Sequence, residues 1–64
     1  MQVNGQYIQL LEPICISDFV KNNSYSEERV AVEKNRNIIP KANFITEMLT
    51  DDDIIEIVHF VGGG

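Results

Sequence analysis

The feature that most constrains this chain is its last stretch, where the apolar residues of 54–61 run directly into Gly62-Gly63-Gly64. A short apolar run rich in isoleucine and valine predicts one strand. Three glycines have no side chain to pack and lose the most backbone freedom on ordering, so we expect a flexible tail at 62–64. Such a tail is thin enough to pass through a channel that side chains would block. It would deliver the carboxylate of Gly64 at its end.

The length of 64 residues allows one small domain. A domain of this size buries only about 60% of its unfolded-chain surface, so the core must be used well. Cys15 is the single cysteine, which excludes an intramolecular disulfide, and no Cys/His spacing suggests zinc. Neither a membrane-spanning apolar run nor a secretory signal pattern occurs, so we expect a cytoplasmic protein with no membrane partner.

Ten acidic and five basic residues give a net charge of −5. Binding to a phosphate backbone needs clustered Lys and Arg, so this charge argues against a nucleic-acid partner. It favours solubility and suits a basic partner surface. We expect the free protein to be a monomer.

Asn4-Gly5 is the strongest signal for a tight hairpin, because a type I′ turn needs positive φ at both central residues. With this pair as the loop, Val3 pairs with Gln6, and paired residues share a face. The residues expected on the inner face of the hairpin are Met1, Val3, Ile8 and Leu10.

A stripe at i, i+3 and i+4 begins at Ile16 and predicts a helix of about two turns. Cys15 and Ser17 are the candidates for its N-cap, and Asn22-Asn23 is expected to end it. The later elements are expected to be a strand at 29–33, a turn at 34–37, a return segment at 38–39, a helical turn at 41–44, a short strand at 47–49, a turn at 50–53 and the final strand.

This order of elements, with the most apolar strand placed centrally beside the first, predicts a β-grasp. The fold class is α+β, with a mixed sheet and one main helix packed on one face. We place a single domain at 1–61 and the flexible glycine tail at 62–64. Besides the hairpin residues, the expected core comprises Ile16, Phe19, Val20, Val30, Val32, Ile39, Leu49, Ile55 and Ile57.

Four stretches carry a family resemblance: Asn4-Gly5 after a short first strand, 30–35, Ile38-Ile39-Pro40 and, most specific, 55–63. On these stretches the whole chain resembles the ThiS family, the sulfur carrier proteins of thiamine biosynthesis. The chain departs from the family pattern at three positions. Asp52 stands where a turn glycine is common, which would cost stability if φ must be positive there. Asn23 replaces an apolar residue, with Tyr25 as the candidate for the missing contact, and Gly64 is a third glycine.

The resemblance implies a substrate protein rather than an enzyme, with no bound cofactor or metal. An adenylating enzyme similar to ubiquitin-activating enzymes would use ATP and magnesium to turn the Gly64 carboxylate into an acyl adenylate. Sulfur from a cysteine persulfide, supplied by a donor such as a cysteine desulfurase, would displace AMP and leave a thiocarboxylate. Thiazole synthase would use that sulfur to build the thiazole ring.

Three other functions remain open at this point. The small subunit of molybdopterin synthase also ends in Gly-Gly and carries a thiocarboxylate, but it is usually longer and has prolines near its tail. A ubiquitin-like modifier would be joined to lysines of other proteins. A plain interaction domain would carry an irrelevant tail.

Residues of the final strand alternate between the two faces of the sheet. If Ile55 and Ile57 face the helix, Val58 and Phe60 face away from it, next to the tail. Together with Val61 they are the predicted partner-binding residues. Phe60 is the expected anchor, because aromatic residues bury large areas and dominate interfaces.

Three further groups have structural interpretations that outweigh the functional ones. His59 is the only histidine and has no residues spaced to act with it in acid–base chemistry. Cys15 is more plausible as a small apolar filler than as a sulfur relay. Asp51-Asp52-Asp53 lacks the alternating oxygens, glycine and late glutamate of a calcium loop, so a solvated turn is expected.

Overall fold

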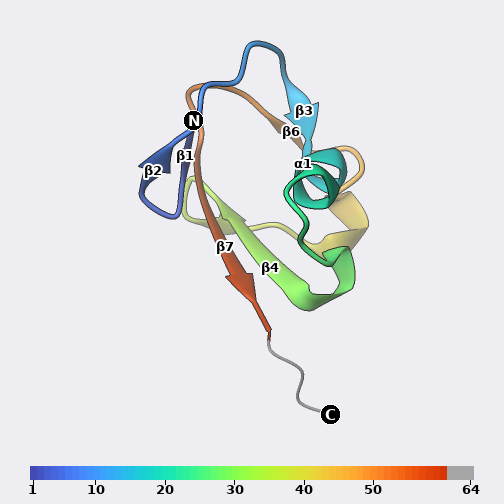
Figure 1. The fold of residues 1–64 in the computed structure, drawn as a ribbon. Coiled ribbons are helices and arrows are strands. Elements are labelled where there is room, and N and C mark those ends of the chain that lie inside the picture. The colour runs from blue at the N-terminus through green and yellow to red at the C-terminus, as the bar shows by residue number, and fades with distance from the viewer. Residues whose placement is uncertain (61–64) are drawn as a thin grey trace.

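The computed structural model describes residues 1–60 (Figure 1). The elements are β1 (Gln2–Val3), β2 (Gln6–Tyr7), β3 (Ile14–Cys15), α1 (Ile16–Asn22), the 3₁₀ turn η1 (Glu27–Arg29), β4 (Val30–Lys34), β5 (Asn37–Ile38), the 3₁₀ turn η2 (Lys41–Asn43), β6 (Met48–Leu49) and β7 (Ile54–His59). The predicted boundary between a domain at 1–61 and a tail at 62–64 lies outside the described residues. Among the described helices, none is long and apolar enough to cross a membrane.

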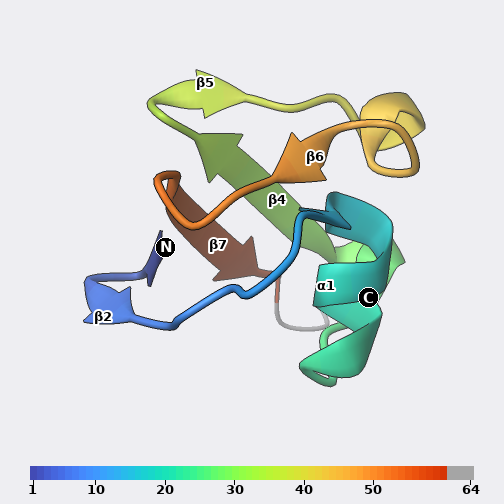
Figure 2. The same cartoon turned by 90° about the horizontal axis from the view of Figure 1, so that it is seen from above.

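Within residues 1–60 the strands form a five-stranded sheet of order β2-β1-β7-β4-β5 and a two-stranded sheet of β3 and β6. β7 is central, as predicted, and pairs parallel with β1 and antiparallel with β4. α1 lies on one side of the larger sheet (Figure 2). This arrangement confirms the expected mixed sheet and the β-grasp.

The first hairpin turns at Asn4 and Gly5, whose φ angles are 51° and 84°. Val3 pairs with Gln6, so the predicted register is confirmed. The prediction that Ile8 is a core residue is wrong, because its side chain is 37% exposed. Ile8 directly follows β2, which is an edge strand, so no further strand lies on that side of it. Leu10 is partly buried and packs against the core.

Cys15 is the N-cap of α1, with its Sγ accepting a hydrogen bond from the Asp18 amide at 3.5 Å. The helix ends after Asn22, and Ser24 then takes a φ of 65°. The Tyr25 amide bonds back to the Val20 carbonyl at 3.0 Å, as in a Schellman motif. This turn brings Tyr25 against the core, where it supplies the contact expected of it.

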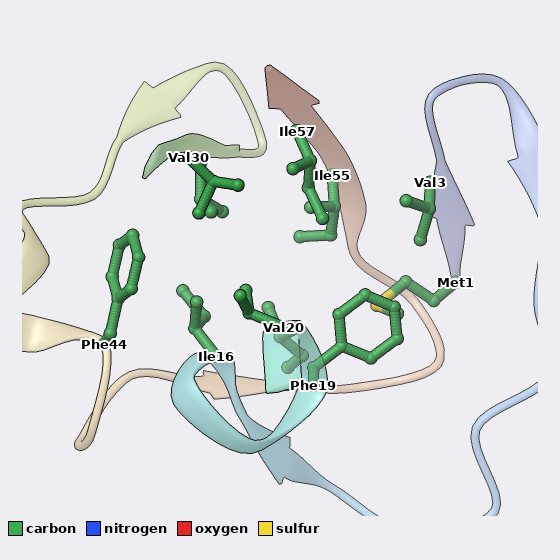
Figure 3. Packing of buried hydrophobic residues seen from close by; sticks show 11 residues of the cluster. Met1, Val3, Ile16, Phe19, Val20, Val30, Phe44, Ile55 and Ile57 are labelled. Carbon is green, nitrogen blue, oxygen red and sulfur yellow. The ribbon is translucent and has the colours of Figure 1, made fainter. Parts of the chain in front are cut away.

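The core lies between α1 and the sheet (Figure 3). The buried apolar residues are Met1, Val3, Ile16, Phe19, Val20, Val30, Val32, Phe44, Leu49, Ile55 and Ile57. All were predicted except Phe44, which is 1% exposed and follows η2 in a segment with no period of its own. Ile39, predicted as core, is partly buried and packs against the cluster.

Non-glycine residues with positive φ among the described residues are Asn4, Ser24, Asn35 and Arg36. Asn35 and Arg36 form the two-residue loop of the β4–β5 hairpin, since Lys34 pairs with Asn37. Asp52 is not in this group, so its departure from the family pattern carries no backbone strain of that kind.

Candidate partner-binding face of the last strand

β7 is fixed on one side by Asn4. The Asn4 amide donates to the Ile55 carbonyl at 2.9 Å. Its side-chain Oδ1 accepts from the Ile57 amide at 2.7 Å, and its Nδ2 donates to the Ile57 carbonyl at 3.1 Å. A side-chain amide therefore continues the β1–β7 ladder where the main chain of β1 has already turned away.

On its other side, the start of β7 is fixed by Asn35. The Asn35 amide donates to the Ile54 carbonyl at 2.8 Å, and its Oδ1 accepts from the Ile54 amide at 2.9 Å. Its Nδ2 donates to Asp53 Oδ1 at 2.9 Å. Sequence reasoning placed both asparagines only in turns. An asparagine in a tight turn has a side-chain amide that can form further hydrogen bonds, and this was the available signal in the sequence. The signal does not identify the strand to which the amide bonds.

The side chains of β7 alternate as predicted. Ile55 and Ile57 are 0% and 6% exposed, whereas Val58 and Phe60 are 56% and 57% exposed. The Phe60 amide donates to the Arg29 carbonyl at 2.7 Å, so its backbone is held while its ring faces outward. Two apolar side chains thus lie in line on the side of β7 away from the core.

Further apolar residues share this outer face of the sheet. Ile54 pairs with Gln2, which pairs with Tyr7, and these three lie in one row across the strands. A second row joins Glu56, Glu33 and Ile38. Ile38, Ile54 and Tyr7 are exposed, and the sequence alone did not indicate that they share the face of the sheet that carries Val58. We call the surface formed by Ile38, Ile54, Glu33, Glu56, Val58 and Phe60 the outer face.

His59 lies on the opposite side of β7 from Val58. Its ring stands beside that of Tyr25, with centroids 6.4 Å apart and planes at 41°. Cys15 is partly buried and its thiol caps α1. Both residues therefore have a structural place, in line with the interpretations favoured from the sequence.

Asp51 organises the turn that precedes β7. Its carboxylate accepts hydrogen bonds from the Leu10 amide at 2.8 Å, the Met1 ammonium at 3.0 Å and the Tyr7 hydroxyl at 3.1 Å. The Leu10 amide and then the ammonium lower the pKa of Asp51 below its usual value. The hydrogen bond to Asp51 raises the pKa of Tyr7.

Asp53 is buried at the start of the strand. Burial raises its pKa, but the Thr50 amide at 2.7 Å, the Asn35 side chain and the Lys34 ammonium together hold that pKa below its usual value. These partners are protein groups, so the turn is a hydrogen-bonded structural element. Across residues 1–60 no group of three or more His, Cys, Asp or Glu side chains is placed to hold a metal ion.

The predicted reactive group and tail, Gly64 with Gly62 and Gly63, lie outside the described residues, as does Val61. The structure brings Val58 and Phe60 together on the outer face immediately before that stretch. Their role in binding a partner stays a prediction.

A central last strand, one crossing helix and an exposed outer face define a ubiquitin-like β-grasp domain. Its sequence matches the ThiS family over residues 1–64. The chain therefore belongs to the ThiS family.

Individual relatives agree with this assignment. The chain is 38% identical over 65 residues to a protein of Bacillus subtilis named sulfur carrier protein ThiS, covering 100% of this chain and 98% of that one. A crystal structure of a thiamine biosynthesis protein (ThiS) from Geobacter metallireducens superimposes with a TM-score of 0.77 at 26% identity, covering 98% of this chain and 96% of that one. A thiazole synthase of Paramagnetospirillum magneticum is 31% identical over 62 residues, which are 97% of this chain and 19% of that protein.

Proposed function

We propose that this chain carries sulfur for thiazole formation on the carboxylate of Gly64. The observation that carries the proposal is the outer-face position of Val58 and Phe60, which are exposed on a strand clamped from both sides. A rigid strand with an apolar outer face gives a partner a fixed surface to grip, directly before the glycines. Membership of the ThiS family supports the same role.

A carboxylate is a poor electrophile, so the proposed first step replaces one of its oxygens as a leaving group. In a partner adenylating enzyme, the Gly64 carboxylate attacks the α-phosphorus of ATP, held with magnesium, and pyrophosphate leaves. A persulfide sulfur, delivered from a cysteine desulfurase, then attacks the acyl carbon and AMP leaves. Cleavage of the resulting acyl disulfide by a thiol yields the thiocarboxylate. In this scheme the chain is a substrate, and the partners do the catalysis.

The proposed acceptor of the sulfur is a thiazole synthase. A stretch similar to nearly all of this chain makes up 19% of the Paramagnetospirillum magneticum thiazole synthase. Joining two modules in one chain raises their effective concentration, which is useful when the modules act on each other. This supports a functional contact between the two when they are separate proteins. We propose the cytoplasm as the location of this scheme, which is the compartment expected from the sequence.

Intact mass spectrometry tests this function. The chain is incubated with ATP, magnesium, an adenylating enzyme and a cysteine desulfurase with cysteine. The expected product is the chain with one oxygen replaced by sulfur. A variant lacking Gly63 and Gly64 should stay unmodified, and its thermal midpoint should be nearly unchanged.

Other outcomes identify the rival functions. Adducts on lysines of other proteins would identify a ubiquitin-like modifier. Sulfur delivery to a molybdopterin precursor but not to thiazole synthase would identify the molybdopterin-type carrier. An unchanged mass under all conditions would reject sulfur carriage.

A further inference from the structure

Two acidic residues lie side by side on the outer face, and neither forms an ion pair with a described residue. Glu33 on β4 and Glu56 on β7 are directly paired across the two strands. Directly paired residues have Cβ atoms about 4.5–5.5 Å apart, and like charges in such pairs destabilise a sheet. Within residues 1–60, neither carboxylate takes part in a salt bridge.

Apolar side chains surround this acidic pair. Ile38 continues the row on β5 and is 76% exposed. Along β7, Ile54 and Val58 flank Glu56 and are 52% and 56% exposed. A surface hollow of about 470 Å³ opens here, and it is lined by Glu33, Asn35, Arg36, Ile54 and Glu56. A protein seated on the outer face would exclude water from the pair and strengthen its electrostatic interactions.

The chain's own cations leave this charge largely unbalanced. Lys34 bonds to Glu47 at 2.7 Å and lies 4.0 Å from Asp53, and Lys21 pairs with Glu27. Arg36 reaches the rim of the hollow but forms no ion pair within 4.0 Å with another described residue. The whole chain carries a net charge of −5, so a cationic group of a partner would meet an acidic surface here.

We infer that the outer face binds a protein surface that presents an arginine in apolar surroundings, and that Glu33 and Glu56 together receive this arginine. A guanidinium is planar and carries five donors, so it can bond to two carboxylates at once, which a lysine ammonium does less well. The inference rests on the proposed function, because it assigns the arginine to the adenylating enzyme, which must bind the chain before any sulfur is loaded.

Titration calorimetry with the purified adenylating enzyme tests the site. The double variant E33Q/E56Q removes both charges with little change of shape, and its dissociation constant should rise about tenfold. E12Q is the matched control, because Glu12 is exposed in the β2–β3 loop and makes no side-chain hydrogen bond within the described residues. E12Q changes the net charge by one unit, against two in the double variant, and should bind like the parent chain.

Two further readouts separate this site from a general charge effect. The loss of affinity in the double variant should persist when salt is added, because salt screens a covered ion pair poorly. A loss caused by long-range charge effects would shrink with added salt. Changing the enzyme's interface arginine to lysine should weaken the parent chain but have little added effect on the double variant. The thermal midpoint of the double variant should be equal to or above that of the parent, which excludes misfolding as the cause.

Binding of E33Q/E56Q that is as tight as the parent's, or tighter, would overturn the inference. In that case the mass assay would still show sulfur loading of the parent chain if the proposed function holds. Failure of the parent chain both to bind the enzyme and to be loaded would reject the inference and the proposed function together.

Discussion

Asn4 and Ile57 exchange two hydrogen bonds, one through each atom of the Asn4 side-chain amide, across 53 positions of sequence. Asn4 also takes a φ of 51° in the hairpin turn, so one residue closes the turn and anchors the central strand. Replacing Asn4 with glycine keeps the backbone conformation accessible but removes both bonds. We expect Asn4→Gly to lower the free energy of unfolding by about 1–3 kcal/mol, measured by urea denaturation.

Asn4→Ala removes the same bonds and adds a Cβ at a positive φ. It should cost more than Asn4→Gly, since a non-glycine residue is strained there without the local hydrogen bonds of asparagine. Equal stability of Asn4→Gly and the parent chain would show that the two side-chain bonds contribute nothing net.

Substitutions of Phe60 and Phe19 should have different effects, one on partner binding and the other on folding stability. Phe60→Ala should weaken binding to the adenylating enzyme by about 2 kcal/mol or more if Phe60 is an interface anchor, and should change the fold little. Phe19→Ala should lower the free energy of unfolding by about 3–5 kcal/mol because it opens a cavity in the core. Calorimetry and urea denaturation measure the two effects. Leu11→Ala is the control, since Leu11 is 86% exposed but lies outside the outer face.

Two outcomes would contradict these expectations. Equal losses of folding stability from Phe60→Ala and Phe19→Ala would place Phe60 in the core. Binding losses of the same size for Phe60→Ala and Leu11→Ala would remove the special role of the outer face.

Stability should fall on the acid side. The pKa values of Asp51 and Asp53 are lowered in the folded chain, so their contribution is fully present above the unfolded value of about 3.9. It is lost as the pH falls through the lower folded values, because protonation then breaks the hydrogen bonds. The thermal midpoint, measured from neutral pH downwards, should therefore decline once the pH falls below the unfolded pKa of about 3.9.

Asp51→Asn and Asp53→Asn should flatten this acid decline, whereas Asp52→Asn should not. Asp52 is exposed and its side chain makes no hydrogen bond within the described residues, which makes it the matched control. An acid decline that is unchanged in both Asp51→Asn and Asp53→Asn would assign the effect to other carboxylates.

Phe44 and Ile45 are neighbours with opposite environments, at 1% and 71% exposure. Phe44→Ala should lower the free energy of unfolding by about 3–5 kcal/mol. Ile45→Ala should change it by less than about 0.5 kcal/mol. Urea denaturation of both variants checks this, and similar losses would contradict the burial of Phe44.

Elements with a local signature could be predicted from the sequence, and long-range relationships could not. The Asn4-Gly5 turn, the N-cap at Cys15 and the alternation of β7 each depend on neighbours a few positions away. The prediction that Ile8 is buried was wrong because its exposure depends on the position of β2 at the edge of the sheet. Phe44 was missed because an isolated aromatic in a loop shows no period.

The candidate site divides in the same way. Outward-facing Val58 and Phe60 follow from the period of one strand. The pairing of Glu33 with Glu56 and the nearness of Ile38 depend on which strands are adjacent, and on a register that no local pattern fixes. The second role of Asn35 likewise required knowing that β7 starts beside the β4–β5 turn.

The parallel pairing of β1 and β7 sets where a reporter group can be attached. The first strand and the last begin at the same end of the molecule, and the six residues of β7 then run about 20 Å towards the other end. The Met1 ammonium is engaged by Asp51, so a label there would disturb the turn. The β2–β3 loop lies near the same end and is exposed at Glu12 (Figure 1). A fluorophore or surface tether at Glu12 would leave the opposite end free for an enzyme, so binding and release could be followed without the probe blocking them.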